Sequence, residues 1–509
     1  MNSKNIIPDI KAGIVVFLVA LPLCLGIALA CKAPLFSGLL AGIIGGIVVT
    51  TFSGSALSVS GPAAGLTAIV LSSTATLGSF EVFVAAVIFA GIIQVAFGIL
   101  KAGNIGSYIP NAVIKGMLAG IGIILIIKQI PHLVGYDKDP EGDFDFLQSD
   151  GHNTFSDLLY MLNYISPGAI IVAAVSFFVL FIADMEFYKR DKVLSFIPGP
   201  VLAVGFGILL NISFSKWDNQ FINIDPEHLV NLPIIKNFGE FTSILVTPDY
   251  SQILTIKFWV VVFTIAIVAS LESLLSVEAT DKLDPKKRNS NSNKELLAQG
   301  LGNIFCGLAG ALPVTSVIVR SSANIHAGSK SKLSTIIHAL LLLVCILALP
   351  NVLMLIPNAS LAAILIVIGY KLAKPSLFKH YFYKGNDQII PFVVTILVMI
   401  LTDLLKGVTA GLIISVIFII RSNIKSSFDT ATEIIDTKPH HLIKLPQHVT
   451  FFNKGFLVRY LKDIKPESNL IIDGSINRTF DNDVKEVLTE FIKAGKEKQI
   501  EIKLINFNL

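Results

Sequence analysis

The sequence predicts a polytopic α-helical membrane protein with fourteen transmembrane segments, followed by a small α/β domain. Three observations predict this class. First, 53% of the 509 residues are hydrophobic and only 15% are charged, whereas soluble domains average about 25% charged residues. Second, long apolar segments recur along the first 425 residues. Third, basic residues gather in alternate loops between these segments, as the positive-inside rule requires.

The N-terminus has features of a secretory signal peptide. Lys4 and Lys11 precede an apolar run that ends at Cys31, which is the order of charge and hydrophobicity in a leader. However, the run continues after KAPL into a second apolar stretch at 37–52. A helical hairpin has this pattern and a mature secreted domain does not, so we expect that this segment stays in the protein.

The apolar segments number fourteen, and several are shorter than the ~20 residues that a full span needs. They are 12–30, 33–52, 60–76, 82–100, 106–128, 167–186, 193–212, 256–277, 295–312, 313–326, 333–350, 352–371, 388–402 and 405–421. The third and the tenth open with Gly or Pro, in SGPAAGLTAIVLSS from Ser60 and LPVTSVIVRSS from Leu312. Each is the third member of a set of seven. We expect both to be half-helices that begin inside the membrane.

Loop charges predict how the segments are oriented. The loop 132–165 holds seven acidic residues and, among lysines and arginines, only Lys138. The loops predicted to be cytoplasmic hold Lys189, Arg190, Lys192, Lys282, Lys286, Lys287, Arg288, Lys294, Lys330, Lys332, Lys371, Lys374, Lys379 and Lys384. A cytoplasmic N-terminus therefore satisfies the positive-inside rule. Because seven is odd, the second seven segments are inverted relative to the first, which is typical of secondary transporters with a substrate site at the midplane.

Two half-helices that start in the membrane would form an anion site. Their first amide groups lack partners within the helix and carry the positive end of the helix dipole, and such ends bind anions. Hydroxyl groups stand at the start of both segments, and Arg320 adds a full charge one to two turns in. The predicted anion-binding residues are Ser60, Gly61, Ala63, Ala64, Val314, Thr315, Ser316, Val317 and Arg320.

Arg320 lies in an otherwise apolar stretch. An arginine at the centre of a membrane helix costs about 2.5–3.5 kcal/mol on insertion scales. It therefore needs an anion or a carboxylate nearby. The alternative, that Arg320 reaches the cytoplasmic surface near Lys330, stays open at this point.

Glu272 is the carboxylate candidate, because it lies deep in the eighth segment. Ser276 follows four residues later and shares its helical face. An acid at this depth is functional by default. Glu272 could carry a proton, bind Na⁺ together with hydroxyl groups, or pair with Arg320, and all three interpretations stay open.

These residues carry a family resemblance. The stretches LESLLSVEATDKLD and NSNKELLAQGLGNIFCGLAGALPVTSVIVRSSANIHAGSKSKLS resemble the core of the SulP anion permeases, which include sulfate permeases and bicarbonate transporters. In the first half, VVFLVALPLCLGIALACKAPLFSGLLAGIIGG and LSVSGPAAGLTAIV resemble the first three segments of that family. The stretches FLVALPLCLGIA and VSGPAAGLT resemble the branch of the family whose members are often fused to, or encoded near, carbonic anhydrase.

The resemblance implies an architecture and a set of partners. It implies a membrane domain over 1–425, divided into a core (segments 1–4 and 8–11) and a gate (segments 5–7 and 12–14) past which the core moves like an elevator. It also implies a homodimer in the cell membrane with both termini cytoplasmic, and it makes a carbonic anhydrase a candidate partner. We expect a small inorganic anion as substrate, no nucleic acid, and no cofactor or metal except Na⁺ as a coupling ion.

The resemblance also implies roles for single residues. Na⁺-coupled bicarbonate members have a carboxylate where Glu272 stands and a hydroxyl where Ser276 stands. They also have hydroxyl groups on the third and tenth segments, here Thr67 and Thr315, so these four residues are the predicted site of the coupling cation, Na⁺ or H⁺. Arg320 matches a basic residue near the anion of some relatives. Many relatives have Pro-Gln where this chain has Pro22-Leu23, which puts a sulfate preference in doubt, and glutamate rather than aspartate at 272 leaves proton coupling open.

The C-terminal part, over 440–509, alternates strands and helices and resembles a short STAS domain, the cytoplasmic tail common in SulP proteins. HLIKL at 441–445, NLIIDGSI at 469–476 and EIKLINF at 501–507 read as strands, and 452–464 and 481–496 read as helices. Related regulatory domains have a phosphorylatable serine at the start of the last of these helices. Here Asn482 stands there between two acidic residues, so we expect no serine switch at that point.

We therefore predict a secondary active transporter of small oxyanions, with bicarbonate ahead of sulfate, coupled to Na⁺ or H⁺. A sulfate–proton symporter, an anion exchanger and a nucleobase permease are alternative transporters. An anion channel or a STAS-regulated signalling scaffold would be a different class. No GxxxxGK[ST] motif is present, so the chain contains no site of this kind for driving transport with ATP, and we predict that it is not an enzyme.

Overall fold

The computed structural model describes residues 6–137, 146, 153–191, 197–217, 222–230, 245–348, 350–425, 428–435 and 438–506. Contacts divide the chain into two units, Met1–Leu412 and Ile413–Leu509, which we describe separately. Most acidic residues of the loop 132–165, together with Lys138, Lys192 and the last predicted strand residue, Phe507, lie outside the described residues.

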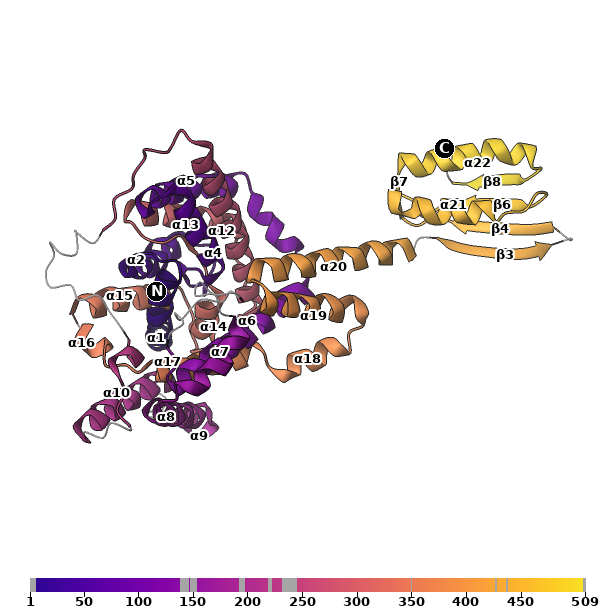
Figure 1. Ribbon diagram of the computed structural model, residues 1–509. Helices are drawn as coiled ribbons and strands as arrows, with labels where there is room; N and C mark the ends of the chain where they lie inside the picture. The colour runs from indigo at the N-terminus through magenta and orange to yellow at the C-terminus, as the bar shows by residue number, and fades with distance from the viewer. Residues whose placement is uncertain are drawn as a thin grey trace. The chain divides into compact units, whose positions relative to one another are not determined.

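The first unit is helical, and each of the fourteen expected segments contains a helix in the described part of the chain (Figure 1). The first seven are α1 (Ile6–Ala30), α2 (Leu35–Ile44) with the π-helix Gly45–Val49 and α3 (Thr50–Phe52), β1 (Ser60–Pro62) with α4 (Thr67–Leu77), α5 (Phe80–Ile99), α6 (Asn111–Val134), α8 (Pro167–Asp184) and α10 (Gly199–Trp217). The second seven are α12 (Ile256–Leu283), α13 (Ser292–Leu308), β2 (Val314–Ser316) with α14 (Ile318–His326), α15 (Leu333–Ala348), α17 (Asn358–Leu372), α19 (Asn386–Leu401) and α20 (Leu404–Lys425). Short helices α7 (Thr154–Tyr160), α9 (Glu186–Arg190), α16 (Pro350–Leu353) and α18 (Pro375–Phe382) lie between them.

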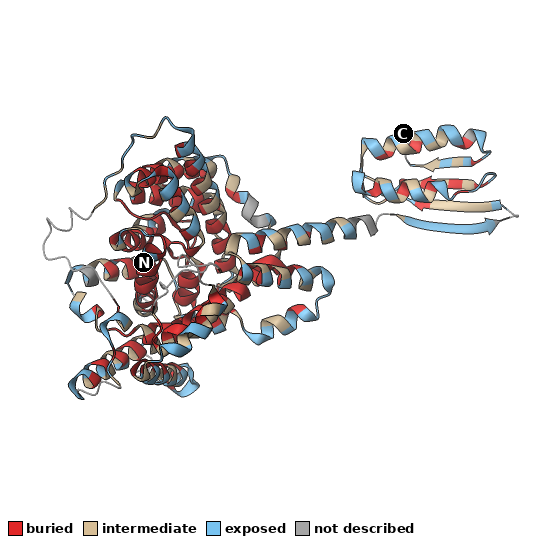
Figure 2. Cartoon of the chain, viewed as in Figure 1, coloured by how far each residue is buried: buried red, intermediate tan, exposed pale blue. Residues whose placement is uncertain are grey.

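Apolar surface distinguishes the inner helices from the outer ones. Nine helices of the described part are long and apolar enough to cross a membrane. Side chains of α1 and α5 are mostly buried, whereas α8 and α10 expose large apolar side chains such as Phe178, Phe181 and Leu209 (Figure 2). An apolar outward face of this kind suits contact with lipid rather than water.

The third and tenth segments differ from simple half-helices, because each begins with a short strand. β1 pairs with β2 in antiparallel register, with Gly61 opposite Thr315. Pro62 has no amide proton, and the β-branched pair Val314-Thr315 favours an extended backbone. The strand pairing satisfies main-chain groups that would otherwise lie unpaired inside a membrane.

A close approach of two glycines reflects the inverted repeat. Gly122 of α6 and Gly369 of α17 occupy the fifth segment of each seven. A Cβ on Gly122 would lie 2.5 Å from the Gly369 carbonyl oxygen, and a Cβ on Gly369 would lie 2.7 Å from that of Gly122. The reciprocal contact brings the backbones of the two equivalent segments against each other.

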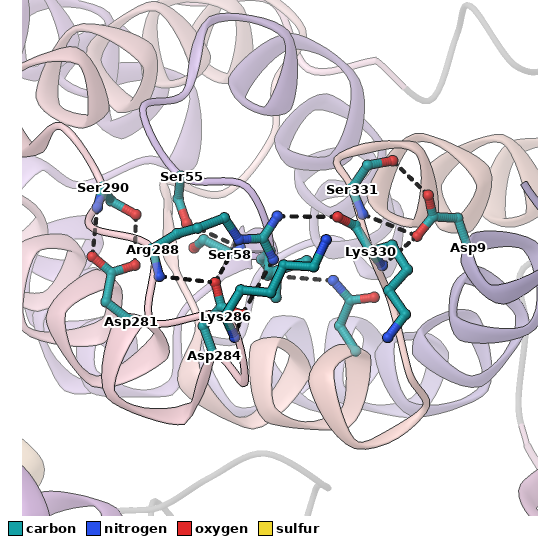
Figure 3. Close-up of polar contacts among 12 residues, drawn as sticks. Asp9, Ser55, Ser58, Asp281, Asp284, Lys286, Arg288, Ser290, Lys330 and Ser331 are labelled. Atoms are coloured by element: carbon teal, nitrogen blue, oxygen red, sulfur yellow. Dashed lines mark hydrogen bonds and ion pairs between the residues drawn. The ribbon is translucent and has the colours of Figure 1, made fainter. Parts of the chain in front are cut away.

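Polar contacts join two connections and the start of α1 at the end of the helices that the charge pattern predicts to be cytoplasmic, which we call the inner face (Figure 3). Asp9 of α1 accepts hydrogen bonds from the amides of Lys330 (2.6 Å) and Ser331 (3.1 Å). Arg288 donates to Asp284 (2.6 Å) and to the Lys330 carbonyl (3.0 Å). These contacts hold the connections after α12 and α14 against the start of α1.

A second polar cluster lies at the opposite end, the outer face. Asp137, which follows α6, contacts His132 Nδ1 at 2.5 Å and His228 Nδ1 at 2.7 Å. The segment 222–230 that carries His228 also pairs with the chain before α17, where the Val230 amide donates to the Ile356 carbonyl (3.0 Å). Asp137 thus ties this external segment to the helical body.

The contacts of Asp137 with His132 and His228, which we call the Asp137 clasp, predict that the stability of the external segment 222–230 depends on pH. Burial alone would raise the pKa of Asp137, but hydrogen bonds from His132 and His228 and the charge on these rings together lower it. The hydrogen bond to Asp137, with the charges of Asp137, Glu227 and Asp225, raises the pKa of His228 against the effect of burial. The clasp therefore stabilises the folded segment fully at pH values between the ordinary pKa of an aspartate, about 3.9, and that of a histidine, about 6.5. This stabilisation is lost when the pH rises above the raised pKa of His228 or falls below the lowered pKa of Asp137.

Hydrogen exchange of residues 222–230, corrected for intrinsic exchange rates, tests this clasp. We expect several-fold weaker protection once the pH passes the raised pKa of His228. His228→Gln should remove this alkaline loss. An unchanged pH dependence in the variant would contradict a role for His228.

The second unit contains a four-stranded sheet in the order β3-β4-β6-β8 (Figure 1). The sheet is formed by β3 (Asp429–Ile435), β4 (Lys438–Lys444), β6 (Asn469–Asp473) and β8 (Glu501–Ile505), while β5 (His448–Val449) pairs with β7 (Thr479–Phe480). Helices α21 (Lys454–Lys462) and α22 (Asn482–Glu497) pack on the sheet through Leu457, Leu461, Val484 and Leu488. The strands and helices expected from the sequence are present, and β3, which precedes residue 440, adds a strand that its exposed, polar sequence did not reveal.

Candidate functional site

A small cavity lies where the two half-helices meet. Its volume is about 40 Å³, and it is lined by Ala64, Gly65, Ile121, Ile124, Glu272, Ser276, Val317, Ile318, Val319 and Leu404. One water needs about 10–15 Å³ measured in this way, so the cavity has room for a small ion with little water. It is the place that the sequence predicted for the substrate.

Glu272 and Ser276 both line this cavity from α12. Their i, i+4 spacing places them on one face of the helix, as predicted. Glu272 is 7% exposed and Ser276 is 4% exposed. The Glu272 carboxylate lies against the backbone of Gly65, because a Cβ at that glycine would be 3.0 Å from Oε1 and 3.2 Å from Oε2. A carboxylate is therefore directed at the start of the first half-helix.

The second half-helix presents its N-terminus to the same cavity. The Ser321 amide donates to the Val317 carbonyl at 3.0 Å, which makes Val317 the N-cap of α14. The amides of Ile318, Val319 and Arg320 precede that hydrogen bond, and such groups have no acceptor within their own helix. Because Val317, Ile318 and Val319 line the cavity, the positive end of the helix dipole faces it.

Arg320 is fully buried, at 0% exposure, which excludes the alternative that it reaches the surface. Its guanidinium lies against Gly61 of β1, because a Cβ on Gly61 would be 2.1 Å from Nη1 of Arg320. A Cβ on Gly42 of α2 would be 3.8 Å from the same nitrogen. Within the described part of the chain, its three nitrogens have no oxygen acceptor, and the buried thiol of Cys24 is the side chain that lies beside the guanidinium. Glu272 therefore does not hydrogen-bond to Arg320, and Arg320 is not among the residues that line the cavity.

The other predicted residues surround the strand pair. Ala64 and Val317 line the cavity, whereas Gly61, Ala63, Val314 and Arg320 are buried and are not among its lining residues. Three of the predicted hydroxyl groups are engaged: Ser60 Oγ accepts from Gln299 (2.8 Å), Ser316 Oγ bonds to Ser58 Oγ, and Thr315 Oγ1 donates to the Ser316 carbonyl (3.3 Å). Thr67 Oγ1, at the first residue of α4, is buried with no hydrogen-bond partner among the described residues.

A row of polar side chains on α13, which the sequence analysis overlooked, positions the strands. Asn303 accepts from the Val314 amide (2.7 Å) and donates to the Val314 carbonyl (3.1 Å) and to Gln94 (2.6 Å). Gln299 donates to Ser60 and to Glu295, both at 2.8 Å. The spacing of Glu295, Gln299 and Asn303 at every fourth position of an apolar segment was the available signal.

The donor types near the cavity suit a hard cation. Sodium prefers oxygen ligands, as other hard cations do, and the Glu272 carboxylate and the Ser276 hydroxyl supply them from the cavity wall. The other two residues predicted for the cation, Thr67 and Thr315, are not among the lining residues. Elsewhere, Asp225, Glu227 and His228 bring ligand atoms within 4.8 Å of one another on the outer face, but none of these three lines the cavity.

Adding one methyl group at Gly65 tests whether the Glu272 carboxylate lies against the backbone there. Gly65→Ala would place a Cβ 3.0 Å from Oε1 and 3.1 Å from Cδ of Glu272, so the carboxylate would have to shift by a few tenths of an ångström. We expect several-fold slower substrate uptake in liposomes. Gly205→Ala in α10 is the matched control, because no heavy atom lies within 4 Å of its added Cβ. Equal uptake by both variants would contradict the contact between Gly65 and Glu272.

An inverted pair of helical sevens, with two half-helices meeting at a buried cavity, defines a membrane transport protein of the inverted-repeat class. Residues 6–395 match the sulfate permease family. The chain belongs to this family of anion transporters, as the resemblance predicted, and its relatives are transporters rather than enzymes.

Three comparisons locate the chain within that family. A putative sulfate transporter of Bacillus subtilis, YvdB, is 27% identical over 87% of this chain and 78% of its own length. The bicarbonate transporter BicA of Picosynechococcus is 28% identical over 84% of this chain and 72% of its own length. The inward-facing structure of murine Slc26a9, an anion transporter, matches all of this chain and 87% of that chain with a TM-score of 0.70 at 18% identity. The predicted fold class, including the C-terminal STAS-like part, is confirmed.

Proposed function

We propose that this protein is a secondary active transporter that carries bicarbonate in preference to sulfate and is driven by Na⁺ or H⁺. One observation carries the proposal: the carboxylate of Glu272 and the N-terminus of α14 face the same small cavity. One attracts a cation and the other attracts an anion. Two features favour bicarbonate as the substrate. The chain is similar to BicA, and it has Leu23 where many relatives have a glutamine.

The mechanism follows from charge. In our proposal the amides of α14 bind the anion, while Glu272, Ser276, Thr67 and Thr315 hold the coupling cation. The positive charge of Arg320, next to β1, makes the electrostatic potential at the anion site more positive. Anion and cation together neutralise the site, and a neutral site crosses a low-dielectric barrier at far lower cost than a charged one. We propose that the core then moves past the gate like an elevator, and that a core with only one ion bound does not move.

The remaining family properties are part of the same proposal. We propose a homodimer in the cell membrane with both termini cytoplasmic, and a carbonic anhydrase as a functional partner. A sulfate–proton symporter and an anion exchanger use the same cavity, so they differ from our proposal only in substrate and coupling ion.

Uptake by purified protein in liposomes tests the proposal. Labelled bicarbonate and labelled sulfate are compared with an inward Na⁺ gradient, an inward H⁺ gradient or no gradient. We expect bicarbonate uptake to be saturable and raised by a cation gradient. Sulfate uptake raised only by H⁺ would replace our proposal with the sulfate–proton symporter, and uptake that does not saturate would indicate a channel.

A further inference from the structure

A second and larger cavity lies at the C-terminal end of α14, whereas the candidate site lies at its N-terminal end. Its volume is about 210 Å³, and it shares no lining residue with the smaller cavity. Helices α1 and α14 form one wall, and α8, α9, the start of α10 and α17 form the other. It lies near the inner face, since its basic residues belong to the segment ends that the charge pattern predicts to be cytoplasmic.

The charge of this cavity favours one anionic group. Lys11 and Lys371 lie on different walls. Asp184 is the carboxylate among the lining residues, and it lies 3.9 Å from Lys371 Nζ, at the limit of an ion pair. Among the described lining residues, two lysines stand with one carboxylate, and His326 lies beside them as a further hydrogen-bonding group.

The rest of the wall is apolar. Val15, Leu180, Ile364, Val367 and Ile368 line it. The phenol of Tyr188 on this wall donates its hydrogen bond to the Ile197 carbonyl at 2.6 Å. A small inorganic anion would leave this apolar surface in contact with water, whereas an acyl chain would cover it.

We propose that this cavity binds a single-chain anionic amphiphile, with its carboxylate between Lys11 and Lys371 and its chain against Leu180, Val367 and Ile368. The site is distinct from the transport cavity. Its effect on transport rests on the proposed function, in which α1 and α14 belong to the core and α8, α10 and α17 to the gate. An occupant that contacts both walls would hold them together and slow uptake.

Binding of tritiated decanoate to the full chain in phosphatidylcholine nanodiscs tests the site, with empty nanodiscs as background. We expect saturable binding near one molecule per chain, and at least tenfold weaker competition by decanol, which lacks the charge. Lys11→Gln with Lys371→Gln should weaken decanoate binding at least tenfold. Lys379→Gln, an exposed lysine on α18 outside the cavity, is the control and should bind normally.

A second variant guards against misfolding of the double lysine variant. Val367→Phe keeps both lysines and fills the cavity, and we expect it to abolish saturable binding. Binding equal to that of the unmodified chain in this variant, or no saturable binding to the unmodified chain, would overturn the proposal. This measurement needs no transport, so it stands or fails separately from the proposed function.

Nanodiscs that contain phosphatidylglycerol identify the natural source of the amphiphile. Persistent decanoate binding supports a free single-chain ligand. Binding that phosphatidylglycerol suppresses in the unmodified chain would instead assign the site to a two-chain anionic lipid of the bilayer and would overturn the single-chain occupant.

Discussion

Glu272→Gln is expected to abolish uptake driven by a cation gradient. The amide keeps the size of the side chain but removes the negative charge that faces the cavity and the start of α4. Without this charge, neither Na⁺ nor a proton is held beside the anion, so a cation gradient can no longer drive the anion across the membrane. We expect gradient-driven uptake in liposomes to fall at least a hundredfold.

The matched control lies on the same helix. Glu278→Gln changes a carboxylate six residues further along α12 that forms an ion pair with Lys282 at 3.1 Å and does not line the cavity. We expect this variant to keep nearly normal uptake, because partly exposed ion pairs contribute little. Full Na⁺ or H⁺ dependence in Glu272→Gln would refute the coupling role of Glu272. Equal loss in both variants would indicate damage to α12 rather than to a cation site.

Asn303→Ala is expected to have the second largest effect, although Asn303 does not line the cavity. Its side chain binds both the amide and the carbonyl of Val314. Alanine would leave these buried groups unpaired, at a cost of about 1–3 kcal/mol each. Because Val314 is in the strand that precedes α14, we expect the N-terminus of α14 to lose its fixed position. Uptake should fall at least tenfold and the melting temperature by several degrees.

Asn211→Ala provides the comparison for Asn303. Asn211 is also buried, and it donates one hydrogen bond, to the Leu355 carbonyl at 3.1 Å, far from the strand pair in sequence. We expect a smaller fall in melting temperature and little change in the concentration of anion that half-saturates uptake. If Asn303→Ala loses stability but keeps the affinity for the anion, Asn303 has a structural role and does not position α14 for anion binding.

Local patterns accounted for most of the fold. Hydropathy located all fourteen segments because a membrane helix must be apolar over most of its length. The i, i+4 spacing placed Glu272 and Ser276 together because they lie on one helix. The strands β1 and β2 were read as the starts of half-helices, since nothing local in SGP or VTS reveals that these two stretches pair with each other.

The sequence by itself determined the class of protein, the two interrupted segments and the acid at their junction, because these depend on composition and on spacing within one helix. Only the tertiary structure decided the direction of Arg320, the clamp of Asn303 on Val314 and the second cavity between α14 and α17. Each of these depends on which segments lie side by side. Side-chain contacts across a packed interior follow from that arrangement, and the pattern of any one segment does not contain it.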